Sequence, residues 1–393
     1  MKYDVCIVGL GTAGAAVALQ CARRGLSTLG IERRGLDVAG AHWVNGVALT
    51  AFDRADIPRP MAPEHRGAHG RFHLVCGWGP DRLSLADECV VEVDMRHLVK
   101  RLQRDAGAAG AELREGVRAE RLEGDTLHTD RGPIEARFFV DASGLRGLGL
   151  LPIPEVPRED LCAAAQEVRR VSDRVAAEAY FARNGAEPDE TLCFTGVAGG
   201  YSIVNLSLRA DEISILTGSL PALGHASGKQ LLDDFVEQHP WIGERLFGGS
   251  RAIPLRAPRG ALARGNVAAI GDSVSQVFAA HGSGIAVQLE SSKILAEAIV
   301  ARDLESYSRR WHERYGLRFR VSDWFRRFSQ TLTPSELAAL MRSGLLDERS
   351  VLAGLRQELP KASLSDLGQK LPALWEQRWV LGRALGVAAR ELR

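Results

Sequence analysis

Seven residues near the start of the chain have the types and spacing that dinucleotide binding requires. Three glycines in the pattern G-x-G-x-x-G end an apolar run, and an acid ends the next apolar run 18 residues further on. Such a turn lets the backbone approach a pyrophosphate, the helix after it presents free amides, and the acid binds the hydroxyls of a ribose. A structural strand–helix–strand unit without a ligand is the alternative. The residues that we assign to this site are Gly9, Gly11, Thr12, Ala13, Gly14, Glu32 and Arg33.

The elements that must position this site follow from the hydrophobic pattern. Residues 2–32 predict strand, tight turn, helix and strand, and residues 94–109 predict a helix that Asp94 caps. Alternating side chains predict antiparallel strands over 191–220, and a second strand–loop–helix unit follows at 265–304. We therefore expect an α/β fold in which a Rossmann-like domain is interleaved with an antiparallel-sheet substrate domain. The expected boundaries are a discontinuous cofactor domain at 1–150 and 260–306, with 45–90 contributing to the substrate side, a substrate domain at 151–259 and a helical C-terminal region at 307–393.

The bulk composition excludes several classes of function. The chain has 393 residues, of which 45% are hydrophobic and 25% charged, and a net charge of +1, which argues against a dedicated nucleic-acid binder. Its six cysteines form no CxxC pair and no zinc spacing, so we expect no metal site and a reducing compartment. The N-terminus has no signal-peptide pattern, and no apolar stretch is left over to span a membrane. We expect a cytoplasmic protein.

Several motifs, taken in order, resemble those of a known group of enzymes. The glycine turn with its acid, Arg96 opening a helix, VDASG at 140–144 and GD at 271–272 before a glycine loop are similar to FAD enzymes of the p-hydroxybenzoate hydroxylase fold, within the glutathione-reductase-like superfamily. GGY at 199–201, IPL at 253–255 and the segment 271–285 resemble geranylgeranyl reductases, whereas FVDASGLRG resembles flavin-dependent halogenases. The resemblance covers residues 1 to about 310 and implies FAD as cofactor.

The resemblance also implies the second half of the cofactor site. Asp272 ends an apolar strand and precedes a turn, where its carboxylate can accept hydrogen bonds from the ribityl hydroxyls; its alternative role is a helix N-cap. Amides of the loop that opens the next helix can face the pyrimidine edge of the flavin, where negative charge develops on reduction. The family places an arginine at the position of Arg96 beside the flavin, and a solvated first-turn arginine is the alternative. The residues assigned here are Arg96, Asp272, Gly282, Ser283, Gly284 and Ile285.

Departures from the family patterns decide between reactions. The reductases usually have a Lys-x-Cys-Gly loop after the second strand, whereas residues 39–47 here are AGAHWVNGV. Tryptophan halogenases of similar fold use a lysine in the long segment after the second strand, and no lysine lies between residues 33 and 99. These departures disfavour halogenation and count against polyprenyl reduction.

The favoured activity is therefore monooxygenation of an aromatic or electron-rich substrate, a metabolite or a peptide side chain, through a flavin C4a-hydroperoxide. The alternative is an FAD-dependent alkene reductase that acts on a lipid or polyprenoid, as in the geranylgeranyl reductases. A flavin-fold scaffold without turnover is a third possibility. The polar side chains placed near the reacting ring, each of which has a structural role as its alternative, are His42, Trp43, Asn45 and His281. Because a second nucleotide fingerprint is absent, we expect NAD(P)H to bind transiently or a separate flavin reductase to supply electrons.

Aromatic residues and arginines recur in the C-terminal region. Tyr307, Trp311, Tyr315 and Phe319 are spaced four residues apart. Such a helix can lie on a membrane or grip a lipid, but a packed face with arginines extending to solvent is the favoured interpretation. We expect a small-molecule or peptide-borne substrate and no nucleic-acid partner, with peripheral membrane contact as the less favoured possibility.

Overall fold

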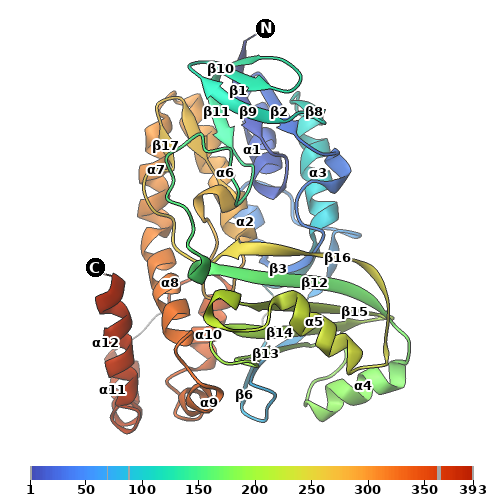
Figure 1. The fold of residues 1–393 in the computed structure, drawn as a ribbon, viewed down its shortest axis with the longest axis vertical. Helices are drawn as coiled ribbons and strands as arrows, with labels where there is room; N and C mark the ends of the chain where they lie inside the picture. The colour runs from blue at the N-terminus through green and yellow to red at the C-terminus, as the bar shows by residue number, and fades with distance from the viewer. Residues whose placement is uncertain (1, 69, 87–88, 361–363, 392–393) are drawn as a thin grey trace.

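The computed structural model describes residues 2–68, 70–86, 89–360 and 364–391. Two large sheets dominate it, one in the upper and one in the lower part of Figure 1, with helices along one side. The α/β fold predicted from the sequence is confirmed.

The first sheet carries the predicted dinucleotide unit at its centre. Its main order is β17-β18-β11-β1-β2-β8, in which all pairs are parallel except that between β17 and β18. Off this path, β10 pairs antiparallel with β11 and with β9. The segment after residue 111 supplies β8, which pairs with β2, and two strands that extend β11. The strands are β1 (Tyr3–Val8), β2 (Thr28–Glu32), β8 (Glu112–Glu115), β9 (Ala119–Glu123), β10 (Thr126–Thr129), β11 (Ile134–Asp141), β17 (Ala263–Arg264) and β18 (Val267–Ala269).

Three helices pack around this sheet. Every residue of α1 (Thr12–Ala22) is buried, because its small side chains fit closely between α3 (Met95–Ala108) and α6 (Ile285–Val300). Asp94 caps α3 as predicted, since its side chain accepts a hydrogen bond from the amide of Arg96 at 3.1 Å.

The second sheet is nearly all antiparallel, and its order is β16-β12-β15-β14-β13-β5-β6. β5 and β6 come from the segment before α3, and β13 joins β5 in parallel. The strands are β5 (Arg71–Cys76), β6 (Arg82–Ala86), β12 (Leu161–Val171), β13 (Thr191–Thr195), β14 (Ser202–Arg209), β15 (Glu212–Ser219) and β16 (Ile242–Pro254). Helices α4 (Arg174–Arg183) and α5 (Gly228–Glu237) bury Phe181 and Phe235 in one apolar cluster with this sheet.

A small three-stranded sheet connects the two large ones. It consists of β3 (Val44–Ala48), β7 (Val90–Asp94) and β4 (His65–Ala68), with β7 in the centre. Helix α2 (Leu49–Arg54) follows β3 in the chain. β3 contains Asn45, and β7 leads directly into α3. This sheet therefore connects the loop after β2 to the substrate side of the molecule.

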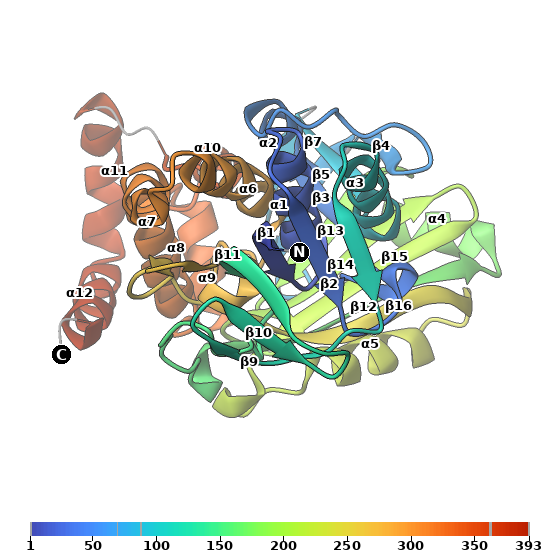
Figure 2. The same ribbon diagram turned by 90° about the horizontal axis from the view of Figure 1, so that it is seen from above.

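The C-terminal region is helical. Its elements are α7 (Leu304–Trp311), a π-helical turn (His312–Gly316), α8 (Leu317–Ser329), α9 (Pro334–Arg342), α10 (Glu348–Leu355), α11 (Leu364–Glu376) and α12 (Trp379–Glu391). Tyr307, Trp311, Tyr315 and Phe319 are each at most 3% exposed, so the aromatic stripe is a packed face. None of the described helices is long and apolar enough to span a bilayer. Figure 2 shows α11 and α12 at the edge of the molecule, away from both large sheets.

Candidate flavin site and substrate cavity

A groove lies beyond the carboxyl ends of β1, β2 and β18, where open α/β sheets bind their ligands. The predicted cofactor-binding residues that line it are Gly9, Gly11, Thr12, Ala13, Glu32, Arg33, Asp272, Gly282, Ser283, Gly284 and Ile285. They come from two segments about 240 residues apart, which the parallel pairing of β11 with β1 and β18 brings together. Gly14 and Arg96 do not line the groove.

The glycine turn has the close packing that its spacing predicts. Gly9 has φ +95°, and a Cβ there would lie 2.5 Å from the carbonyl oxygen of Ala142. A Cβ on Gly14 would lie 1.8 Å from the carbonyl oxygen of Gly9, so only glycine lets α1 approach the turn this closely. No side chain caps the N-terminus of α1 at Gly11, which leaves its amides directed at the groove. These features fit a bound pyrophosphate.

Glu32 connects the end of β2 to the turn. Its carboxylate accepts hydrogen bonds from the backbone amides of Leu10 and Arg34, each at 3.1 Å, and the residue is 7% exposed. A ribose bound here would meet an acid that these two amides already orient.

Asp272 lies on the opposite wall, in a short 3-10 turn after β18. Its carboxylate accepts a hydrogen bond from the Gln288 side chain at 3.1 Å, which connects it to α6. Burial raises the pKa of Asp272, and this effect is opposed by Arg251 and by the Gln288 hydrogen bond. The N-terminus of α6 at Gly284 likewise has no side-chain cap. A half-buried acid and uncapped amides fit the ribityl chain and the pyrimidine edge of a flavin.

Arg251 is a further residue of this groove that the sequence did not reveal. It reaches from β16 of the second sheet and donates a hydrogen bond to the Gly40 carbonyl, opposite the Gly11 turn. Burial lowers the pKa of Arg251, Asp272 opposes that effect, and Arg34 adds to it. The substrate sheet therefore supplies a cation to the cofactor groove.

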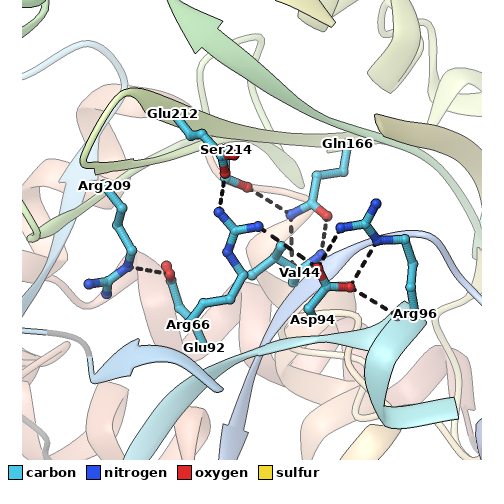
Figure 3. Close-up of polar contacts among 9 residues, drawn as sticks. All are labelled: Val44, Arg66, Glu92, Asp94, Arg96, Gln166, Arg209, Glu212 and Ser214. Carbon is cyan, nitrogen blue, oxygen red and sulfur yellow. Dashed lines mark hydrogen bonds and ion pairs between the residues drawn. The ribbon is translucent and has the colours of Figure 1, made fainter. Parts of the chain in front are cut away.

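Arg96 lies outside the lining of the groove, against an acid and an aromatic ring. Its guanidinium forms two hydrogen bonds to Asp94, at 3.0 and 2.7 Å (Figure 3). It also lies 3.3 Å from the centre of the Phe247 ring. Because Asp94 is 1% exposed and also caps α3, it holds Arg96 at the start of that helix.

A second cavity of about 510 Å³ adjoins the flavin groove. Asn45 and Ser283 line both spaces and so mark where they meet. One wall of the cavity is the face of the second sheet, and the other walls come from β3, β7 and the C-terminal helices. Most of its apolar lining comes from α8 onward, with side chains that include Val321, Trp324, Phe325, Leu332, Leu337, Leu345, Leu346, Val351 and Leu355.

The predicted catalytic side chains occupy distinct places. Asn45 stands at the junction, and Trp43 lines the groove but is 5% exposed, with its Nε1 donating to the Gly249 carbonyl at 3.2 Å. His42 lines neither the groove nor the cavity. Burial lowers the pKa of His42, and the nearby charges of Arg96, Arg251 and Arg34 add to this effect.

His281 lines the substrate cavity beside the flavin-facing loop. Its Nδ1 accepts a hydrogen bond from the Ser283 amide at 3.3 Å, and its buried Nε2 has no hydrogen-bond partner among the described residues. Burial lowers its pKa to about 4, so the ring is neutral at pH 7.

Tyr201 was noted in the sequence only as part of a motif. Its hydroxyl lies beside Gly282, where an added Cβ would be 3.2 Å from it, and its ring lines the substrate cavity. Burial raises the pKa of Tyr201 well above its ordinary value, with Cys162 and Cys193 adding to the effect, so the phenol keeps its proton.

Comparisons with known proteins agree with this geometry. No family model matches the chain. It is 28% identical over 379 residues to a digeranylgeranylglycerophospholipid reductase 2 of Methanothermobacter thermautotrophicus, covering 87% of this chain and 92% of that protein. In structure it is similar to a geranylgeranyl bacteriochlorophyll reductase-like protein of Thermoplasma acidophilum, with a TM-score of 0.73 at 20% identity, covering 96% and 99% of the two chains. The chain is an FAD-dependent oxidoreductase.

Two further solved structures are similar to this chain in fold. A flavin-dependent brominase has a TM-score of 0.65 at 16% identity, covering 96% of this chain and 99% of that one. A probable FAD-dependent monooxygenase of Pseudomonas aeruginosa has a TM-score of 0.59 at 17% identity, covering 90% and 99%. At these identities the likeness concerns the fold and leaves the reaction open.

Proposed function

We propose that this flavoenzyme reduces carbon–carbon double bonds of a lipid or polyprenoid chain. The observation that carries the proposal is the cavity of about 510 Å³, whose predominantly apolar lining reaches the flavin groove at Asn45 and Ser283. An extended apolar chain gains free energy along such a lining, roughly 25 cal/mol for each Å² of apolar surface removed from water.

The comparisons support this alternative better than the monooxygenation favoured by the sequence motifs. The relative named above is a reductase, and the two chains match over nearly their full lengths. The missing Lys-x-Cys-Gly loop counts against reduction, because the reductases usually have it. The apolar lining of the cavity next to residues 39–47 does not depend on the cysteine of that loop.

The groove residues, among them Glu32 and Asp272, would hold FAD, which once reduced would supply a hydride to one carbon of the double bond. The other carbon then needs a proton, so that the substrate gains two hydrogens in all. We assign this proton to the hydroxyl of Tyr201, a residue that lines the cavity; the hydroxyl lies beside Gly282 and stays protonated at neutral pH. Neutral His281 is a hydrogen-bonding group in this scheme, because a ring with a pKa of about 4 carries no acidic proton at pH 7. The apolar lining excludes water.

The electron source is also part of the proposal. NAD(P)H that binds transiently, or a separate flavin reductase, would reduce the flavin, since the sequence has one dinucleotide fingerprint and that one serves FAD.

Turnover under two atmospheres tests the reaction. The yellow holoprotein is reduced with dithionite and mixed with a C20 prenyl alcohol, first anaerobically and then with ¹⁸O₂. Anaerobic gain of two hydrogens, detected by mass spectrometry, is the expected result. A product that forms only with oxygen and carries one labelled atom would refute reduction and restore monooxygenation.

The proton assignment has its own variant. Tyr201→Phe keeps the ring in the apolar lining and removes the hydroxyl, so we expect substrate binding to persist and the solvent deuterium isotope effect on turnover to change. Unchanged turnover and isotope effect would assign the proton to another source.

A further inference from the structure

One region of the substrate cavity is polar. Alternate residues of a strand face the same side, so Asn205 and Ser207 of β14 both line the cavity, about 7 Å apart along the strand. Ser214 lies opposite Ser207 on β15, Gln166 adds its amide from β12, and Glu92 lines the same cavity from β7. Figure 3 shows Glu92, Gln166 and Ser214. We call these residues the polar recess: Glu92, Gln166, Asn205, Ser207 and Ser214.

Two members of the recess have hydrogen-bonding capacity left. The Ser207 hydroxyl is buried and has no hydrogen-bond partner among the described residues. The Asn205 amide faces the Cys193 thiol, a weak partner whose pKa burial raises to about 12. A buried hydroxyl without a partner is unfavourable, and a bound polar group that pairs with it would remove that cost.

The charges around the recess favour an uncharged ligand. Glu92 is 5% exposed and its carboxylate accepts a hydrogen bond from Arg209, while Arg66 pairs with Glu212 and lies 3.8 Å from Asp94 (Figure 3). These guanidinium groups therefore already face carboxylates. Among the described residues that line the cavity, the cation is Arg318 of α8, within the helical part of the wall. A carboxylate with hydroxyl and amide neighbours suits a donor such as an alcohol and repels an anion.

We propose that the polar recess binds an uncharged hydroxyl group at one end of the substrate, while the apolar chain extends along the wall formed by α8, α9 and α10. This inference rests on the proposed function, since it names the class of prenyl substrate that the same cavity takes. It excludes a phosphate in the recess.

Ligand binding to the holoprotein tests the recess without turnover. Three C20 probes share one prenyl chain and end in a hydroxyl, a methyl group or a phosphate, and binding is followed by the perturbation of the flavin absorbance. The alcohol should bind about tenfold more tightly than the hydrocarbon, which corresponds to ~1.4 kcal/mol, and the phosphate should bind more weakly than the alcohol.

Two variants locate the effect and one controls for it. Ser207→Ala and Asn205→Leu should lower the affinity for the alcohol to that for the hydrocarbon and leave the hydrocarbon affinity within about twofold. Ile203→Val removes one methylene from the same face of β14, so it should weaken both probes equally.

Several outcomes would overturn the recess. They are equal affinities for alcohol and hydrocarbon, tightest binding of the phosphate, no binding of any probe, or a Ser207→Ala variant that keeps the full preference for the alcohol. The proposed function can fail separately. Selective binding of the alcohol without anaerobic reduction would refute double-bond reduction but support hydroxyl binding in the polar recess. Anaerobic reduction without selectivity for the hydroxyl would support the reaction and refute the recess.

Discussion

Replacing Gln166 should destabilise the junction between the two cavities. Gln166 lies on β12 and is 3% exposed, and its side chain pairs with the backbone of Val44 much as a neighbouring strand would. Its Oε1 accepts from the Val44 amide at 2.6 Å, and its Nε2 donates to the Val44 carbonyl at 2.8 Å and to the Ser214 hydroxyl at 3.2 Å (Figure 3). Gln166→Leu keeps the volume and leaves both Val44 groups without this partner.

The size of the effect follows from these contacts. Each buried backbone group that loses its partner costs about 1–3 kcal/mol, and the buried leucine returns about 1 kcal/mol of hydrophobic free energy. The net loss is therefore about 1–5 kcal/mol. Unfolding entropy near 60 °C is about 2.1 cal/mol/K per residue, so a chain of 393 residues should melt about 1–6 °C lower.

Calorimetry of the FAD-loaded protein measures this shift. Ser214→Ala is the matched control, because it removes one 3.2 Å hydrogen bond from Gln166 and leaves the Val44 pairing intact; its melting temperature should fall by less than about 1 °C. Since Val44 precedes Asn45, the flavin absorbance should also shift in Gln166→Leu. A melting temperature within 1 °C of the parent protein, or equal shifts for both variants, would refute the role given to Gln166.

Three further predictions concern single residues. Gly14→Ala should abolish FAD binding, seen as loss of the yellow colour, because its Cβ would lie 1.8 Å from the Gly9 carbonyl oxygen. The control Gly107→Ala in α3 should retain FAD, because its Cβ meets nothing within 4 Å, and equal behaviour of the two variants would contradict the prediction. Asn45→Ala should keep its FAD content and lose about tenfold in turnover, the worth of ~1.4 kcal/mol, and loss of FAD or full activity would count against a substrate role. His281 has a folded-state pKa of about 4 against 6.5 unfolded, so its contribution to the free energy of unfolding, at most about 3 kcal/mol, is complete above pH 6.5 and is lost as pH falls to 4. In urea titrations at pH 7 and 4.5, the free energy of unfolding should fall less for His281→Asn than for the parent protein. Equal falls would refute this prediction.

The cofactor groove was largely predictable because its signals are local. The glycine spacing and the acid at the end of β2 each follow from a few neighbouring residues, and the uncapped amides follow from a glycine that opens a helix. Asp272 also followed from its position between an apolar strand and a turn, and the structure directs its carboxylate to Gln288. Such patterns can be recognised in a sequence because the backbone geometry of the turn alone requires these residues at these spacings.

Contacts between distant segments were not predictable. Arg251 reaches Gly40 across 211 positions and Gln166 reaches Val44 across 122, and neither residue has a neighbour in sequence that marks it. Arg96 was expected beside the flavin, but the sequence does not show that Phe247 will lie under its guanidinium. The helical wall of the substrate cavity depends in the same way on how α8, α9 and α10 fold back against the second sheet.

The pairing of β18 with β11 also has a consequence for biosynthesis. The first turn of the groove leaves the ribosome with β1 and α1, but Asp272 and the loop before α6 follow only after the whole second sheet has been translated. Nascent chains therefore carry an exposed half-groove while about 240 further residues emerge, a state in which unburied strand edges invite misassembly. The amount of FAD available when Ile285 emerges should then set the yield of native protein. In riboflavin-starved cells, a larger share of the chains should therefore misassemble and be degraded by proteases.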